Sequence, residues 1–206
     1  MGCRLRYSRP LQNQKKTRSV MQTFFTSDTH FDDQYSIEYF NRSFKSVDEM
    51  NATMVEKWNR LVTDDDIVYH LGDFTLDDIR HFTKWVNQLK GNIKILPGSH
   101  DGPWLKDFVA TERVQVLAPL VSLEFPEMAA GKGYQVIVLC HYSMQVWDRS
   151  NYGAWHLFGH SHGKLKGIGL SFDVGVDCTE FMPLSLDTIA SKMAHVSTVV
   201  LGSGGT

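Results

Sequence analysis

Histidine and aspartate residues recur at the ends of five short apolar segments of the chain. These segments lead, in order, to Asp28 and His30, to Asp73, to His100 and Asp101, to His141, and to His160 and His162. In α/β proteins, functional side chains gather at the carboxyl ends of strands and on the loops that follow them. A single strand-end aspartate is more often a turn or helix-cap residue, but five such positions in order favour a shared site.

The residue types in this set are those of a metal site. Imidazole nitrogens and carboxylate oxygens without thiolates suit divalent Mn, Fe, Ni or Zn. In the run from Gly159 to His162, alternate residues of an extended segment place both imidazoles on one face. This number of ligands is larger than one ion needs. The sequence therefore predicts two ions that share a carboxylate. Two ions about 3.5–4 Å apart can clamp a phosphate and lower the pKa of a bound water.

The elements that must position these residues alternate between strands and helices. Strand patterns cover Gln22–Ser27, Ile67–Leu71, Asn92–Leu96, Val114–Leu117, Val121–Phe125, Tyr134–Cys140, Trp155–Phe158 and Gly169–Val176. Helical patterns cover Val47–Val62, Leu76–Lys90 and Leu186–Ala194. Ser46 and Glu49 form a capping box before the first helix. This alternation predicts a layered α/β fold with helices outside, and the strand-rich later half indicates sheets beyond one parallel sheet.

Length and composition fit one globular domain. The chain has 206 residues, of which 42% are hydrophobic and 21% charged. We expect a domain over residues 21–200, preceded by a basic extension over residues 1–20 that is disordered or not native. The glycine-rich residues 201–206 are expected to form a flexible tail.

Charge is distributed unevenly along the chain. The first 20 residues carry six cations and no acid, so the rest has 15 basic and 23 acidic residues, a net charge of −8. A domain with this net negative charge repels the phosphate backbone, so binding of long nucleic acid is not expected. No apolar run reaches the ~18 residues of a transmembrane helix, so no membrane span is expected. Three scattered cysteines fit a reduced, intracellular setting, and because the sequence shows no targeting feature a cytoplasmic location is expected.

The order and spacing of the motifs resemble those of the calcineurin-like metallophosphoesterases. The matching positions are Asp28-x-His30, Gly72-Asp73, Gly98-x-His100-Asp101, His141 and Gly159-His160-x-His162. The likeness runs from about residue 21 to residue 192 and is closest to small bacterial and phage members, which carry a phrase like the one from Tyr69 to Phe74. The resemblance implies a four-layer sandwich of two mixed β-sheets flanked by helices.

The resemblance also implies a role for each side chain. One metal ion would be held by Asp28, His30 and His162, and the second by His141 and His160, with Asp73 bridging the two. A metal-bridging hydroxide would be the nucleophile, and His100 would contact the phosphate and protonate the leaving oxygen. General acid catalysis of this kind typically contributes about 10²–10⁴-fold. The expected cofactors are two divalent ions, with Mn the ion expected to support activity in vitro.

The third motif departs from the family at one position. Family members carry an Asn whose amide oxygen is a ligand of the second metal, and this chain has Ser99 there. A serine hydroxyl is shorter and is a weaker neutral ligand, so Ser99 is expected to reach the ion weakly or through water. A weaker second site and slower turnover are the expected consequences.

The leading hypothesis is a metal-dependent phosphoesterase, a hydrolase that acts on a small phosphodiester or phosphomonoester. One alternative is a metal-binding scaffold or interaction module with weak or no turnover, which Ser99 favours and the retained His100 disfavours. A second alternative is a nuclease that acts on short or single-stranded nucleic acid. A hydrolysis assay on small esters and on an oligonucleotide discriminates among the three.

Substrate contacts are predicted outside the metal motifs. Arg42 and Arg149 are candidate contacts for phosphate oxygens if they line the mouth of the site. The aromatic-rich segments Asp32–Phe44 and Ser143–Ala154 flank the metal motifs, and they are the predicted substrate rim.

Overall fold

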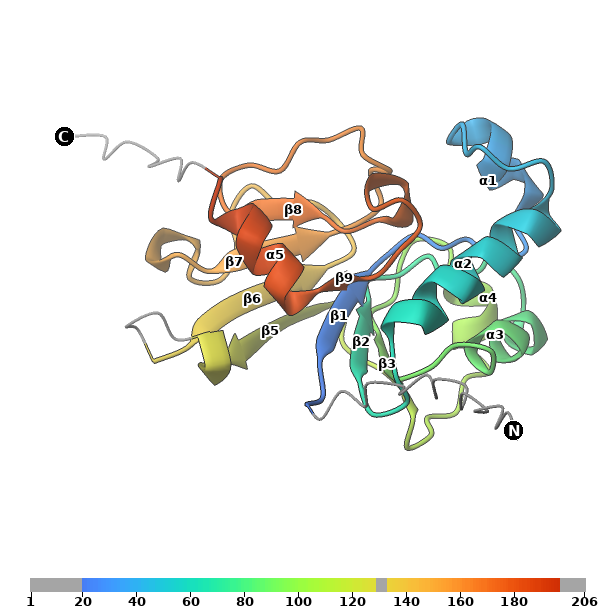
Figure 1. The fold of residues 1–206 in the computed structure, drawn as a ribbon, viewed down its shortest axis with the longest axis horizontal. Helices are drawn as coiled ribbons and strands as arrows, with labels where there is room; N and C mark the ends of the chain where they lie inside the picture. The colour runs from blue at the N-terminus through green and yellow to red at the C-terminus, as the bar shows by residue number, and fades with distance from the viewer. Residues whose placement is uncertain (1–19, 129–132, 197–206) are drawn as a thin grey trace, which may run out of the picture.

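The computed structural model describes residues 20–128 and 133–196 (Figure 1). The predicted tail over residues 201–206, and all of the predicted extension except Val20, lie outside the described residues. Within the described part the strands form two sheets, one of five strands and one of four. None of the helices described there is long and apolar enough to cross a membrane.

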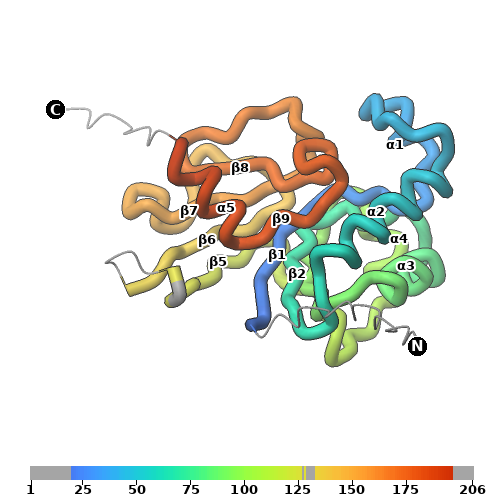
Figure 2. Tube along the Cα trace, in the orientation of Figure 1, coloured from blue at the N-terminus to red at the C-terminus, as the bar shows by residue number. Residues whose placement is uncertain are grey.

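The first sheet has the strand order β4-β3-β2-β1-β9. Its four parallel strands are β1 (Thr23–Thr26), β2 (Ile67–His70), β3 (Asn92–Ile95) and β4 (Val114–Val116). The two-residue strand β9 (Leu184–Ser185) pairs antiparallel with β1, so a late segment of the described chain lies beside the first strand (Figure 2). The carboxyl ends of the four parallel strands therefore meet at one edge of this sheet, where three of the predicted motifs begin.

The second sheet has the order β5-β6-β7-β8. Its strands are β5 (Leu120–Phe125), β6 (Gln135–Cys140), β7 (Trp155–Phe158) and β8 (Ser171–Asp173). β5 pairs antiparallel with β6, whereas β6, β7 and β8 run parallel, so both sheets are mixed. A parallel bridge between Ser27 and Gly175 joins the end of β1 to the segment after β8. This bridge brings the motif-bearing edges of the two sheets together.

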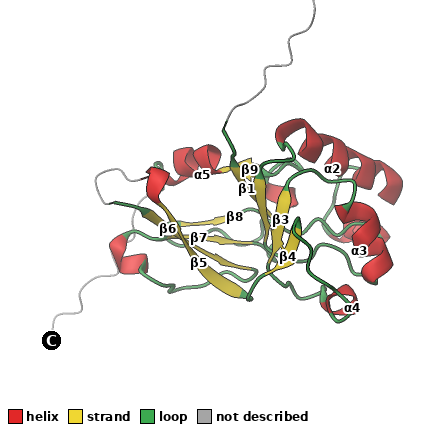
Figure 3. Cartoon of the chain, turned by 90° about the horizontal axis from the view of Figure 1, so that it is seen from below, coloured by secondary structure: helices red, strands yellow, loops and turns green. Residues whose placement is uncertain are grey.

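Three helices cover the outer face of the first sheet (Figure 3). They are α2 (Val47–Leu61), α3 (Ile79–Val86) and α4 (Gly102–Leu105). Met54 and Trp58 of α2 and Phe82 of α3 pack with strand residues Val68 and Ile93 in one core cluster. The cluster buries the apolar stripe that predicted α2.

The predicted capping box forms, with one change. The Ser46 hydroxyl accepts a hydrogen bond from the backbone N–H of Glu49 at 3.2 Å, as expected. The Glu49 carboxylate accepts from the backbone N–H of Lys45 at 2.7 Å, one residue before the position that a standard capping box uses.

A second core cluster fills the space between the sheets. It contains Phe25 of β1, Leu71 directly after β2, Ile137 and Leu157 of the second sheet, and Ile189 of α5 (Leu186–Met193). The outer face of the second sheet is covered differently, because Val136 and Val138 pack there against Met144 and Trp147 of the loop after β6. The expectation of helices on the outside is therefore met on the first sheet, whereas on the second a loop with the short 3₁₀ helix η2 (Ser150–Tyr152) lies outside.

In two helices that differ from the prediction, a capping side chain sets where the helix begins. α3 begins at Ile79, three residues later than predicted, because the Asp78 side chain accepts from the backbone N–H groups of Arg80 and His81. α1 (Gln34–Tyr39) was not predicted, and the Asp33 side chain caps its first turn. A helix of six residues is too short to show a helical period in its sequence.

Candidate metal centre

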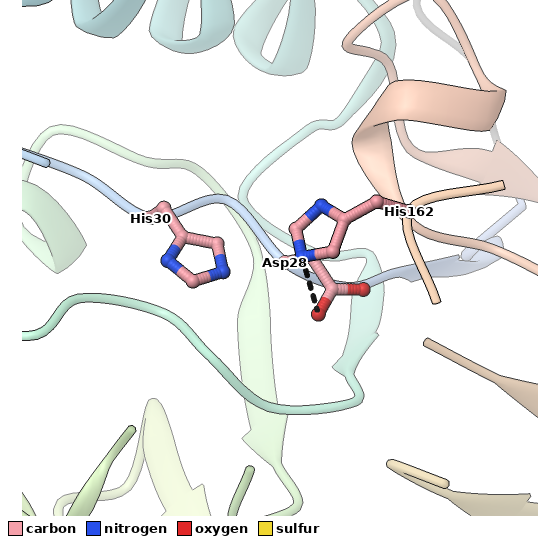
Figure 4. A group of neighbouring side chains, drawn as sticks. All are labelled: Asp28, His30 and His162. Carbon is pink, nitrogen blue, oxygen red and sulfur yellow. Dashed lines mark ion pairs between the residues drawn. The ribbon is translucent and has the colours of Figure 1, made fainter. Parts of the chain in front are cut away.

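Six of the predicted metal ligands converge in two groups. One group contains Asp28, His30 and His162 (Figure 4), and the other contains Asp73, His141 and His160. Within each group the candidate ligand atoms lie within 4.8 Å of one another. The six residues come from the segments that follow β1, β2, β6 and β7, so the junction of the two sheets builds the site.

Asp73 lies between the two groups. Its Oδ2 atom is 3.3 Å from Nε2 of His141 and 3.8 Å from Nε2 of His30. The hydroxyl of Ser99 donates to the same oxygen at 3.0 Å, and the backbone N–H of His100 donates to Oδ1 at 2.8 Å. One carboxylate thus faces a candidate ligand from each group, and Ser99 contacts that carboxylate directly.

Two of the histidines are oriented by hydrogen bonds at Nδ1. His162 donates from Nδ1 to the Asp177 carboxylate at 2.7 Å, and His141 donates from Nδ1 to the Leu71 carbonyl at 2.8 Å. Because both partners are acceptors, Nδ1 carries a proton in each ring, and Nε2 is the nitrogen left to face a ligand. Nε2 of His162 lies 4.0 Å from Oδ1 of Asp28 (Figure 4). Metal-binding histidines are usually held by their second nitrogen in this way.

Three buried ring nitrogens lack hydrogen-bond partners among the described residues. They are Nδ1 and Nε2 of His30 and Nε2 of His141. Buried polar atoms are seldom left without a partner in folded proteins. Burial also lowers the pKa of His30, so its ring is neutral and can offer a lone pair. A bound cation would satisfy these atoms, and the residues present fit such an ion.

The backbone of the candidate ligands is strained. Five of them have positive φ angles: Asp28 (59°), His30 (51°), Asp73 (56°), His160 (65°) and His162 (47°). Such angles cost a non-glycine residue about 1–3 kcal/mol and cluster at functional sites. The strain aims these side chains into one volume, which a purely structural loop would not require.

Two glycines allow the loops after β2 and β3 to touch. A Cβ atom on Gly72 would lie 2.5 Å from the Cα of Gly98 and 2.9 Å from Nδ1 of His141. Any side chain at Gly72 would therefore push Asp73 away from the His141 ring. This close approach explains why both motifs begin with glycine.

Asp101 is the anchor between the same two loops. Its buried carboxylate accepts from the backbone N–H groups of Asp73, Phe74 and Gly98 at 2.8–2.9 Å and from Nε1 of Trp104 at 2.9 Å. Asp101 belongs to neither group of candidate ligands. These four hydrogen bonds hold the two loops in place.

Arg42 lies beneath the site rather than at the predicted substrate rim. Its side chain is buried, pairs with the Asp177 carboxylate at 2.8 and 2.9 Å, and donates to the backbone carbonyls of Asp28 at 2.7 Å and Thr29 at 3.0 Å. Because these donors are directed at protein groups, we correct the prediction that Arg42 contacts substrate.

The sequence analysis missed Asp177 as a residue of the site. Asp177 directly follows the predicted strand Gly169–Val176, so the rule that functional residues follow strand ends would have selected it.

Arg149 also lies away from the metal centre. It is exposed and pairs with Glu124 at 2.8 Å. Together with Tyr134 and Tyr152 it lines a hollow of about 600 Å³, whereas His30 and His100 line a different one. The structure thus does not bring Arg149 together with the candidate ligands.

His70 and His156 are structural residues. His70 is fully buried, accepts from the backbone N–H of Gly72 at 3.2 Å and donates to the Thr29 hydroxyl at 3.0 Å. Burial lowers the pKa of His70 to about 3, so it is neutral. His156 bonds the Val138 carbonyl at 3.1 Å and the backbone N–H of Met144 at 3.2 Å.

Metal binding at the first group should depend on pH. Burial raises the pKa of Asp28 to about 8, so without metal this carboxyl holds a proton at lower pH that an ion must displace. The affinity for Mn²⁺ should therefore rise about tenfold per pH unit up to about pH 8 and level off above it. Calorimetric titrations in buffers of different ionisation enthalpy measure both the affinity and the released protons. An affinity that is constant from about pH 6 to about pH 8 would contradict this.

Removal of the Asp177 carboxylate should weaken metal binding. Asp177→Ala frees the His162 ring to rotate and leaves the buried Arg42 cation without its partner. Loss of such an orienting partner typically costs about 10–100-fold in metal affinity. The control is Asp148→Ala, which removes an exposed carboxylate outside both groups. Equal Mn²⁺ affinity in the Asp177 variant and the wild type would show that His162 does not need this support.

Comparisons with known proteins support the fold. No family model matches the chain. It is 29% identical over 180 residues to an uncharacterized protein of Methanocaldococcus jannaschii, covering 83% of this chain and 90% of that protein. It is 33% identical over 87 residues to the gene 66 protein of Mycobacterium phage L5, covering 41% and 42% of the two chains. The crystal structure of a protein of unknown function, AQ665 from Aquifex aeolicus, matches 84% of this chain and 100% of its own, with a TM-score of 0.63 and 20% identity. This last likeness concerns the α/β two-sheet fold alone.

Proposed function

We propose that the chain is a dinuclear metal-dependent hydrolase of phosphate esters with a calcineurin-like form of the two-sheet α/β fold. The observation that carries the proposal is the pair of ligand groups, with the Asp73 carboxylate facing His30 of one group and His141 of the other. The buried ring nitrogens without partners and the strained ligand backbone support it.

The chain offers ligands for two ions. Asp28, His30 and His162 would hold one ion, His141 and His160 the other, and Asp73 would contact both. When bound, divalent ions at such a site polarise phosphate oxygens and lower the pKa of a water molecule. The donor set of imidazole and carboxylate without thiolate suits Mn, Fe, Ni or Zn.

In this proposal His100 is the proton donor. Its backbone N–H holds Asp73, and its exposed ring lies 5.7 Å from the His30 ring. The His100 side chain is in neither ligand group, so it remains available to a substrate. An imidazolium at this place can give its proton to the leaving oxygen as the ester bond breaks.

The alternatives gain less support. Neither Arg42 nor Arg149 lines the hollow beside His100, so these two predicted phosphate contacts do not support the nuclease hypothesis. The scaffold hypothesis rests on Ser99, whose hydroxyl contacts Asp73 and leaves all six candidate ligands grouped.

Hydrolysis of two chromogenic esters tests the proposal. The chain, freed of metal and then supplied with Mn²⁺, is assayed on bis-p-nitrophenyl phosphate and p-nitrophenyl phosphate. We expect turnover that is abolished by a chelator and restored by Mn²⁺, and the ratio of the two rates reports the preference for diester or monoester. Absence of turnover on both compounds at saturating Mn²⁺ would reject the hydrolase and favour the scaffold.

A further inference from the structure

A hollow of about 550 Å³ opens beside the candidate metal centre, and we call it the α1 hollow. His30 and His100 line one side of it, and Tyr35, Tyr39 and Phe40 of the α1 segment line another. α1 projects at the upper right of the molecule in Figure 1, away from the strands. The hollow is therefore continuous with the place where His100 would meet a leaving group.

The aromatic side chains of the α1 hollow are unusually exposed. Tyr35 is 82% exposed and Tyr39 is 74% exposed, and their spacing of four residues places them on one face of α1. Phe40 is anchored, because its ring stacks on His162 with centroids 3.3 Å apart and planes 11° apart. Rings that stay exposed next to a reactive centre offer a stacking surface to a planar ligand.

The α1 hollow also carries hydrogen-bond acceptors. Asp33 and Glu38 line it, and the Lys164 ammonium lies over one edge of the lining, 5.0 Å from the centroid of the Tyr39 ring. Carboxylates repel phosphate oxygens but accept hydrogen bonds from amino and ring N–H groups. A neutral ring that carries such donors complements both the aromatic and the acidic parts of the lining.

We propose that the α1 hollow binds the leaving group of the substrate, and that this group carries a planar aromatic ring with N–H donors, as a purine nucleoside does. The inference rests on the proposed hydrolase function. In that reaction the oxygen of a water bonds to phosphorus while the bond from phosphorus to the ring-bearing alcohol breaks. The leaving oxygen takes its proton from His100, and His100 regains a proton from the water consumed.

Binding of adenosine to the Mn²⁺-loaded chain tests the hollow without any hydrolysis. Calorimetry should show saturable binding that weakens about tenfold in Tyr39→Ala, because a base stacked on an aromatic side chain loses that much when the ring is removed. Tyr152→Ala is the matched control, since Tyr152 is also 82% exposed but lines a different hollow. Absence of saturable binding, or equal affinity in Tyr39→Ala and the wild type, would overturn the inference.

The two proposals fail in different ways. If adenosine binds through Tyr39 while both chromogenic esters stay intact, the hydrolase is wrong and the ring-binding site stands. If Mn²⁺-dependent hydrolysis is present while adenosine does not bind, the hydrolase stands and the assignment of the α1 hollow is wrong.

Discussion

His100→Ala should lower the rate of phosphate-ester hydrolysis by about 10²–10⁴-fold while the chain still binds its metals. The ring is outside both ligand groups, and the hydrogen bond to Asp73 comes from the backbone N–H, which alanine keeps. The loss should be larger for phenyl phosphate than for p-nitrophenyl phosphate, because the poorer leaving group depends more on protonation. Steady-state kinetics on both esters, with metal content measured alongside, gives the comparison.

His195→Ala is the control for this variant, since it removes an exposed imidazole outside both ligand groups. Its rates should equal those of the wild type. If His100→Ala kept full activity, or lost the same factor on both esters, His100 would not be the general acid.

Trp104→Ala should destabilise the fold by about 3–5 kcal/mol. The Trp104 ring is fully buried and stacks on Phe82 with centroids 4.0 Å apart, so its removal leaves a cavity beneath α3. The change also deprives the Asp101 carboxylate of one of its hydrogen-bond donors. Urea-induced unfolding followed by circular dichroism measures the loss of free energy.

Trp104→Phe separates the two contributions to this loss. Phenylalanine retains a ring against Phe82 but cannot donate to Asp101, whose carboxylate keeps its three backbone N–H donors, so the lost hydrogen bond costs about 0.5–1.5 kcal/mol. We expect this variant to lie between the wild type and Trp104→Ala. A loss below about 1 kcal/mol in Trp104→Ala would mean that the site collapses around the missing ring.

The strands and the grouping of the ligands were predictable from the sequence for a physical reason. Apolar runs such as Ile67–Leu71 and Trp155–Phe158 mark buried strands, and their carboxyl ends meet where parallel strands pair. Asp73 therefore lies at this edge of the first sheet, and His141 lies at the corresponding edge of the second sheet. Pairing of β1 with β2 and bridging of Ser27 with Gly175 then bring the two edges together.

The remaining features depend on tertiary contacts that no local pattern records. β9 has two residues, and only its pairing with β1 makes it a strand. Arg42 was a predicted phosphate contact if it lined the mouth of the site, but Asp177 lies close enough in the fold to pair with it in the interior. The two residues are 135 positions apart in sequence, so their ion pair follows from the meeting of the two sheets.

The location of bound Mn²⁺ tests the central claim most directly. Crystals grown with Mn²⁺ and measured for anomalous scattering would show where the ions bind. The account predicts two peaks, one among Asp28, His30 and His162 and one among His141 and His160, with the Asp73 carboxylate in contact with both. A single peak, or peaks elsewhere on the molecule, would contradict a dinuclear centre.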